Sequence, residues 1–273
     1  MTEFDEILTA WLGRYMWTGL AFATGFARII AVLQIFPLFT ALNVRGTIRA
    51  TLAIVLTIPL VPLIEPQLMQ MGIPDLWVIA TIMIKEFVFG LLLGVLIAIP
   101  FWGIQAAGDI IDVSRGASMA NVADPVNADE NSLTGVVLLY ASLAIFVVAG
   151  GMQLVIELIY HSYSILNISD VAPPMGVATV TAIGDLLTRM FTLGVIISGP
   201  LMIALIVIDL TLVFGHRIAQ QIEVSEFAAI VKNLCVCAFI PLYALFLEEY
   251  MLDDWRELMR FVEAFLLMGE VRE

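Results

Sequence analysis

The sequence predicts an all-α protein of the membrane type, a single domain built from kinked hydrophobic helices. Of its 273 residues, 61% are hydrophobic and only 14% are charged, whereas soluble domains carry about 25% charged residues. The apolar runs are long and show no alternation with a period of two, which favours helices over strands. A backbone inside a bilayer must also satisfy its own hydrogen bonds, as helices do.

Six hydrophobic helical segments are expected along the chain. They cover residues 15–42, 50–64, 76–102, 133–160, 186–214 and 227–250. The second segment is short for a span, because crossing the hydrocarbon takes about 20 residues. A last stretch, DDWRELMRFVEAFLLMG, places apolar side chains on one stripe and charges opposite, so we expect an amphipathic helix at 253–268. The domain as a whole covers residues 1–273.

Prolines and small residues predict helices that are kinked and closely packed. Three prolines lie inside apolar runs and should kink or break those helices: Pro100, Pro200 and Pro241. Two faces carry small residues that let helix backbones approach closely: Gly90 with Gly94, and Gly19 with Ala23 and Ala27. Such faces serve either packing within the bundle or docking onto other subunits, and both readings stay open.

Charged residues inside the apolar runs are candidates for buried ion pairs: Lys85, Glu86, Asp209 and Lys232. A charge at mid-bilayer costs about 2.5 to 3.5 kcal/mol even on insertion scales, so each needs a partner or a wet cavity. Because Lys85 and Glu86 are adjacent, we expect them to point to different faces and not to neutralise each other. Alternatively, an ion-coupled transporter or channel could use a charge relay formed by Arg28, Glu86, Asp209 and Lys232.

The sequence predicts no enzyme, no catalytic residue, no cofactor and no metal site. A net charge of −13 argues against nucleic acid as a partner, because such binding needs clustered positive charge. Asp109, Asp112 and Arg115 begin like the DxxDGxxAR metal signature of membrane phospholipid synthases. Val113 replaces its glycine, however, and the arginine comes two residues early. The acidic residues that follow do not have the spacing of an EF-hand.

Four stretches together resemble the T subunit of the bacterial type III secretion export apparatus, whose flagellar counterpart is FliR. They are KEFVFGLLLG, GDIIDVSRGASMANVADPVNADENSLTG, SGPLMIALIVIDLTLVFGHRIAQQIEV and the lysine of VSEFAAIVKN. Their order and spacing extend over residues 85–235, and RGAS favours the injectisome branch over the flagellar one. The chain departs from the pattern at 219–223, where AQQIE stands in place of APQMN or APQLN.

The resemblance implies a non-enzymatic subunit of an export gate in the bacterial inner membrane, raised toward the periplasm in the assembled machine. It also implies an all-α, multi-helix fold whose helices pack as kinked hairpins. Such a subunit completes a helical pore with the R and S subunits, through which unfolded proteins leave the cell. The switch (autoprotease) subunit and the large export-gate subunit are further expected partners. In this setting the charges at Lys85, Glu86, Asp209 and Lys232 would serve packing between subunits.

The resemblance also implies a channel plug, because relatives carry one after the third hydrophobic helix. Here it would lie within 109–132 and include Asp112, Arg115, Gly116, Ala117, Ser118, Met119, Ala120, Asp124 and Pro125. Small residues fit a narrow pore, acidic residues keep the segment hydrated and movable, and Asp112 and Arg115 have the i, i+3 spacing of an ion pair. The alternative is a solvated connector between two helices.

Overall fold

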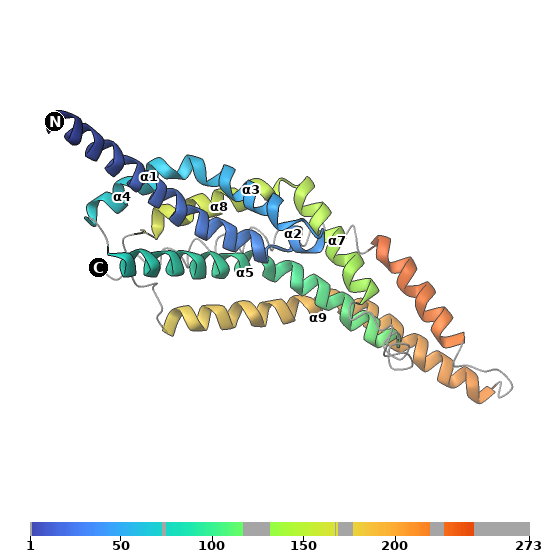
Figure 1. The fold of residues 1–273 in the computed structure, drawn as a ribbon. Coiled ribbons are helices and arrows are strands. Elements are labelled where there is room, and N and C mark those ends of the chain that lie inside the picture. Colours follow the sequence, from blue (N-terminus) through green and yellow to red (C-terminus); the bar gives the residue numbers. More distant parts are fainter. Residues whose placement is uncertain are drawn as a thin grey trace. The chain divides into compact units, whose positions relative to one another are not determined.

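Helices and turns make up the computed structural model (Figure 1), which describes residues 2–72, 75–116, 132–166, 168, 177–218 and 227–242. No strand occurs in these ranges, which confirms the all-α prediction. The helices are α1 (Thr2–Ile35), α2 (Pro37–Ala41), α3 (Gly46–Thr57), the 3₁₀ turn η1 (Ile58–Leu60), α4 (Val61–Gln70), α5 (Leu76–Arg115), α7 (Leu133–Val148), α8 (Gly151–Ile165) and α9 (Val177–Ile218). A further helix covers Phe227–Leu242.

Several of these helices are long and apolar enough to cross a membrane. In the described part of the chain, they are Tyr15–Ile35, Gly46–Gln70, Leu76–Arg115 and Met190–Gly215, and α7 with α8 would add a fifth span if the pair counts as one. At 1.5 Å per residue, the 26 residues of Met190–Gly215 extend about 39 Å, which exceeds the roughly 30 Å of hydrocarbon. The chain is therefore a multi-pass membrane protein.

Several predicted segments have different limits in the structure. The run at 15–42 is divided at Phe36 into α1 and α2, and the run at 76–102 continues as α5 to Arg115. The run at 50–64 belongs to the longer helical stretch Gly46–Gln70, since Pro59 and Pro62 begin helical turns, where a missing N–H costs little. The run at 133–160 is not one helix: α7 ends at Val148 and α8 begins at Gly151. Gly150 lies between them with φ +82°, a left-handed conformation that favours glycine and ends a helix.

The three prolines were expected to kink or to break their helices, and none of the helices is broken there. The helix α5 continues through Pro100 and α9 continues through Pro200, while Pro241 lies in the last turn of Phe227–Leu242. A proline removes one backbone hydrogen bond, and neighbouring groups in a membrane helix can satisfy the freed carbonyl.

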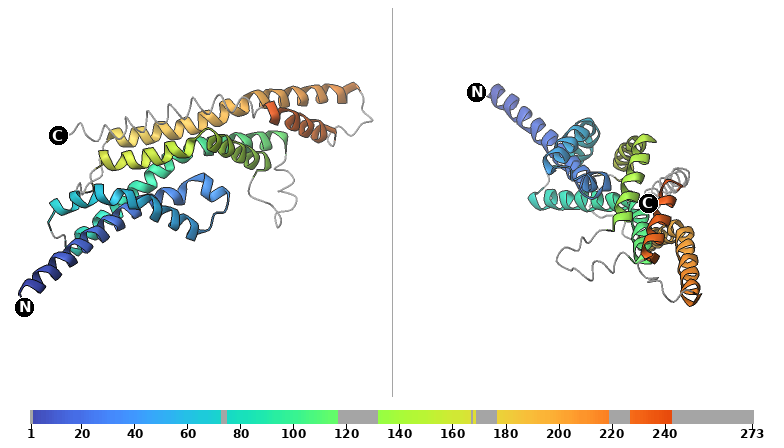
Figure 2. Two further views of the ribbon diagram at one scale, coloured as in Figure 1. Left: turned by 90° about the horizontal axis from the view of Figure 1, so that it is seen from above. Right: turned by 90° about the vertical axis from the view of Figure 1, so that its right-hand side faces the viewer.

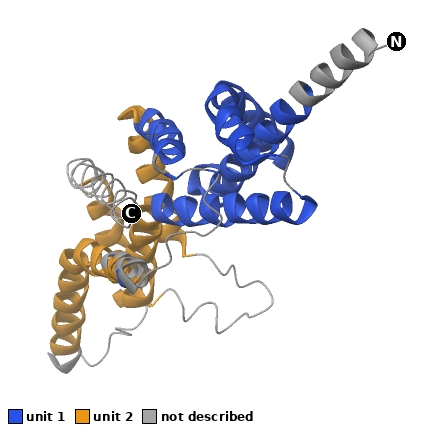
Figure 3. Ribbon diagram, turned by 90° about the vertical axis from the view of Figure 1, so that its left-hand side faces the viewer, with its two compact units in different colours: residues 1–98, 151–183, 259–273 blue, residues 99–150, 184–258 orange. Residues whose placement is uncertain are grey.

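The chain forms two compact units (Figure 3). The described residues of unit 1 come from 1–98 and 151–183, and those of unit 2 come from 99–150 and 184–258. In unit 1, α1 packs against α3 and α4, and these helices lie side by side (Figure 2). Ile29 and Val32 of α1 are both fully buried.

Small residues allow the closest helix contacts within each unit. In unit 1, a Cβ at Gly90 would overlap the carbonyl oxygen of Arg28 and lie 2.8 Å from the Ala31 Cβ. A Cβ at Gly94 would lie 3.2 Å from the Cα of Val32, a tight contact without overlap. The GxxxG face therefore joins α5 to α1 inside the chain, which confirms bundle packing as its use. A Cβ at Gly19, by contrast, would meet no atom within 4 Å.

In unit 2, the end of α5 packs on the start of α7. A Cβ at Gly108 would overlap the backbone of Gly135, so two glycines face each other where the helices meet. Nearer the middle of α5, the rings of Phe101 and Phe146 pack edge to face with centroids 5.3 Å apart. Both rings are nearly or fully buried.

Candidate functional site

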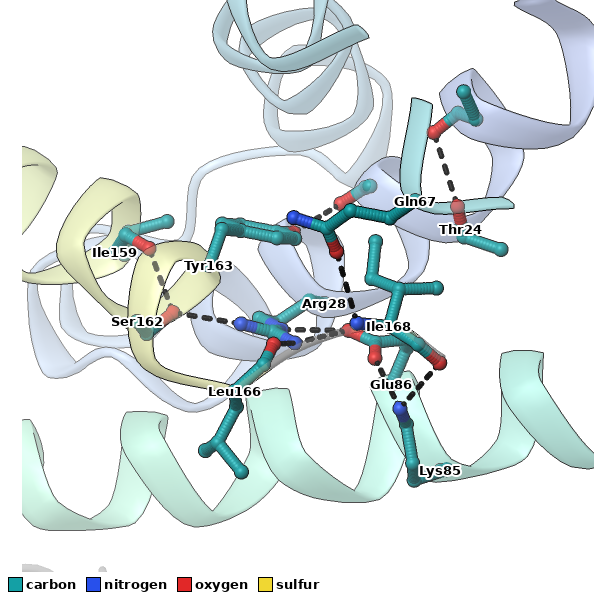
Figure 4. A network of polar contacts seen from close by, with 12 residues as sticks. Thr24, Arg28, Gln67, Lys85, Glu86, Ile159, Ser162, Tyr163, Leu166 and Ile168 are labelled. Carbon is teal, nitrogen blue, oxygen red and sulfur yellow. Dashed lines mark hydrogen bonds and ion pairs between the residues drawn. The ribbon is translucent and has the colours of Figure 1, made fainter. Parts of the chain in front are cut away.

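The strongest polar feature of unit 1 is a buried ion pair between α1 and α5 (Figure 4). Nε and Nη2 of Arg28 each lie 2.6 Å from Oε2 of Glu86. The Arg28 side chain is 1% exposed and that of Glu86 is 0% exposed. The pair is held in place because Gly90 brings the two helix backbones together one turn further along α5. A carboxylate that is this deeply buried requires such a partner.

Lys85 completes the cluster, and the expectation for it was wrong. Its Nζ lies 3.0 Å from Oε1 of Glu86, although the two residues are adjacent in the helix. The long, flexible lysine stem allows the ammonium to turn back toward its neighbour's carboxylate. The same Nζ donates to the carbonyl oxygen of Ile168 at 2.9 Å. Both oxygens of Glu86 are therefore engaged by cations.

The excess positive charge of this cluster meets the carboxyl end of α8. Nη1 of Arg28 donates to Oγ of Ser162 at 3.0 Å, and Nη2 lies 3.5 Å from the carbonyl oxygen of Leu166. The last carbonyls of a helix carry partial negative charge and lack intrahelical partners. No basic residue occurs in the last turn of α8 itself. Arg28 from α1 thus supplies a cation at this helix end.

Aromatic side chains cover the guanidinium. The ring centroid of Tyr163 lies 3.9 Å from Cζ of Arg28, and the ring centroid of Phe89 lies 4.9 Å from it. The Tyr163 hydroxyl donates to the carbonyl oxygen of Gly25 at 2.7 Å, which ties α8 to α1 a second time. The guanidinium is therefore enclosed by a carboxylate, a hydroxyl and two aromatic rings, an arrangement that holds helices together.

A second polar cluster lies in unit 2, where α5 ends and α7 begins. Asp112 is 4% exposed and forms an ion pair with Arg115, Oδ1 to Nε 2.9 Å, as the i, i+3 spacing predicts. Its other oxygen accepts hydrogen bonds from Oγ of Ser132 at 2.7 Å and from the backbone N–H of Thr134 at 3.0 Å. The Thr134 hydroxyl also donates to Oδ1 of Asp112.

The remaining predicted charges pair with each other in unit 2. Nζ of Lys232 lies 2.6 Å from Oδ1 of Asp209, which joins α9 to the helix Phe227–Leu242. The Lys232 side chain is 13% exposed, whereas that of Asp209 is 47% exposed. Thus all the charges singled out at 85, 86, 209 and 232 have a partner within the chain.

The structure covers only part of the predicted plug. Asp112 and Arg115 lie in the last turn of α5, and Gly116 follows with φ +86°. The other predicted plug residues lie outside the described residues: Ala117, Ser118, Met119, Ala120, Asp124 and Pro125. The same is true of the AQQIE stretch and of the predicted helix at 253–268.

The described residues offer no metal-binding group, since none of their His, Cys, Asp and Glu side chains gather in threes or more. Sequence reasoning missed Ser132, Thr134, Ser162 and Tyr163 as partners of the charges. Only Ser132 carries a readable signal: a serine directly before an apolar run is a helix cap, and its Oγ accepts from the N–H of Gly135 at 2.8 Å. The others are distant in sequence from the charges they meet.

Taken together, the fold and these clusters define a helical, multi-pass membrane protein whose buried charges connect one helix to another. Comparison with known protein families identifies the family to which this membrane protein belongs. The family described as bacterial export proteins, family 1, matches residues 20–258, and the chain belongs to that family.

Named relatives fall into secretion and flagellar proteins. The chain is 27% identical to the Yop proteins translocation protein T of Yersinia pestis over 161 residues, which is 59% of this chain and 62% of that protein's length. It is 27% identical to the secretion system apparatus protein SsaT of Salmonella typhimurium over 80% of this chain and 84% of SsaT. The flagellar biosynthetic protein FliR of Bacillus subtilis is 27% identical over 75% of this chain and 78% of FliR.

Proposed function

We propose that this chain is the T-type subunit of a type III secretion export gate in the bacterial inner membrane. It completes a helical pore with the R and S subunits, and unfolded proteins pass through that pore. The observation that carries this proposal is the family match over residues 20–258. The name SsaT, secretion system apparatus protein, supports it, because the likeness to SsaT covers most of both chains.

The role that we propose is architectural rather than enzymatic. The buried charges of the described residues join helices: Arg28 and Glu86 connect α1 to α5, and Asp209 and Lys232 connect α9 to the helix after it. The exposed apolar side chains of α9, such as Ile203, Val207 and Leu210, remain available for lipid or for neighbouring subunits. Contacts with the switch (autoprotease) subunit and the large export-gate subunit belong to the same proposal.

The alternative function, an ion-coupled transporter or channel, has less support. A proton or ion relay needs a carboxylate that can exchange partners during the cycle. Both oxygens of Glu86 are bound by cations, and its side chain is fully buried. Asp209 already pairs with Lys232 within unit 2. These are the contacts of fixed structural pairs.

We further propose that the segment within 109–132 closes the export channel as a plug. The structure refines where a deletion should begin, because Asp112 and Arg115 belong to α5 and their removal would damage the helix end. A deletion of residues 117–128 leaves both side chains in place. It should leave assembly with the partner subunits intact and make resting membranes leak ions.

The test records membrane conductance in cells that contain the assembled gate, with co-purification of the partner subunits as the measure of assembly. The matched control is Ser114→Ala, which removes one hydroxyl bond within α5 and should leave conductance unchanged. Conductance at the parent level in the deletion variant, with assembly demonstrated, would reject the plug and favour the solvated connector.

A further inference from the structure

We propose that Asp112, Arg115, Ser132 and Thr134 form a latch that locks the end of α5 onto the start of α7. These are positioning residues: they fix both ends of the intervening stretch 117–131. Asp112 and Arg115 therefore anchor that stretch and are not the part that would close the channel. The relevance of the latch to gating rests on the proposed function. The contacts that form the latch do not depend on that function.

Asp112 is the centre of the latch because its carboxylate is fully used. Oδ2 accepts from the hydroxyl of Ser132 and the backbone N–H of Thr134. Oδ1 accepts from the hydroxyl of Thr134 and pairs with Arg115. An ionised carboxylate offers about four acceptor positions, and here three hydrogen bonds occupy three of them while Arg115 adds an ion pair. All of these donors except Arg115 come from the far side of the 117–131 stretch.

The backbone geometry makes this contact possible. Gly108 and Gly135 face each other so closely that a Cβ at Gly108 would lie 2.7 Å from the carbonyl carbon of Thr134 and overlap Gly135. Ser132 has two tasks at once, since its hydroxyl donates to Asp112 and accepts from the N–H of Gly135. The cap of α7 and the latch therefore share an atom, and loosening one loosens the other.

Burial makes the latch cooperative. Asp112 is 4% exposed, so a lost donor is not readily replaced by water. Arg115 also reaches the helix Phe227–Leu242, with Nη1 3.3 Å from Oδ1 of Asn233. Removing one hydrogen bond from a buried, charged acceptor should therefore weaken the whole cluster, including the ion pair that holds Arg115.

Trypsin can report on the latch, because Arg115 is the single lysine or arginine between Lys85 and Arg189. Cleavage after Arg115 gives fragments that no other site produces. The informative variant is Thr134→Val, which removes the hydroxyl donor across the 117–131 stretch and leaves the Arg115 side chain untouched. Purified full-length chain in detergent is digested, and the rate of cleavage at Arg115 is compared with the parent.

The latch predicts that Thr134→Val is cut at Arg115 about tenfold faster than the parent, as expected for losing a hydrogen bond to a charged group. Thr134→Ser, which keeps the hydroxyl, and Ser114→Ala, which lies outside the cluster, should be cut at the parental rate. An unchanged rate in Thr134→Val would show that Asp112 and Arg115 are only a local pair. An equal rise at Lys85 and Arg189 would show general unfolding, and it would also overturn the proposal.

This test separates the latch from the export gate. It needs neither partner subunits nor conductance, so a failed latch leaves the gate proposal intact. A plug rejected by conductance likewise leaves the latch intact.

Discussion

Glu86→Gln should be among the most damaging single substitutions in the chain, because it removes the one anion that two buried cations share. Glutamine keeps the shape of the side chain, so packing is preserved and the charge alone changes. Arg28, at 1% exposure, and Lys85, at 9% exposure, would then face each other without a counter-charge. The partial charge at the end of α8 compensates only part of one elementary charge.

The expected loss of unfolding free energy is about 3 to 5 kcal/mol, the range for breaking a buried ion pair by removing one partner. Lys85→Met should cost less, about 1.5 to 3 kcal/mol, because Glu86 keeps both contacts to Arg28. The double variant Glu86→Gln with Lys85→Met should cost less than the sum of the two. Removing Lys85 relieves the repulsion that Glu86→Gln creates, so the two changes should be non-additive by about 1 kcal/mol or more.

Unfolding in mixed micelles, titrated with SDS and followed by far-ultraviolet circular dichroism, measures these differences on the purified chain. The parent, both single variants and the double variant form one thermodynamic cycle. A Glu86→Gln variant within about 0.5 kcal/mol of the parent would contradict the buried ion pair. Strict additivity would show that Lys85 and Glu86 do not interact, as their adjacency in sequence alone suggests.

Further predictions use the same assay. Gly90→Ala should lower the free energy of unfolding by about 1 to 3 kcal/mol, because its methyl group overlaps an α1 carbonyl. Gly19→Ala, in open space, should be neutral or slightly stabilising. Equal effects of the two substitutions would contradict the close approach of α5 to α1. Asp209→Asn should cost about 1 kcal/mol or less, because Asp209 is half-exposed in its pair with Lys232, and a loss near that of Glu86→Gln would contradict this. Tyr163→Phe should cost about 1 kcal/mol through one hydroxyl bond, and Tyr163→Leu clearly more through the lost cation–π contact; equal losses would contradict the role of the ring.

Composition and periodicity were sufficient to predict the helical class, because a chain with 61% hydrophobic residues has few other ways to satisfy its backbone in a membrane. The i, i+3 pair of Asp112 and Arg115 was also predictable, since local spacing on a helix determines it. The GxxxG motif predicted a close helix contact, although only the structure identifies α1 as its partner.

Contacts between distant segments could not be predicted in the same way. Nothing in the sequence connects Arg28 with Ser162, which lie 134 residues apart and meet in the buried cluster. The pairing of Lys85 with Glu86 was missed because helix spacing describes where side chains start and not how far a lysine can bend. The break at Gly150 was missed because VVAGG continues an apolar run, although paired glycines are also a turn signal.

Co-purification of the tagged, full-length chain from its own membranes tests the central proposal most directly. An export-gate subunit should be recovered with two small hydrophobic partners, the R and S subunits, in unequal copy number. The Glu86→Gln variant provides a matched comparison, because loss of the folded bundle should reduce that recovery. Recovery of the parent chain alone, or only with copies of itself, and solute transport by the purified chain in liposomes would contradict the export-gate account and support a transporter.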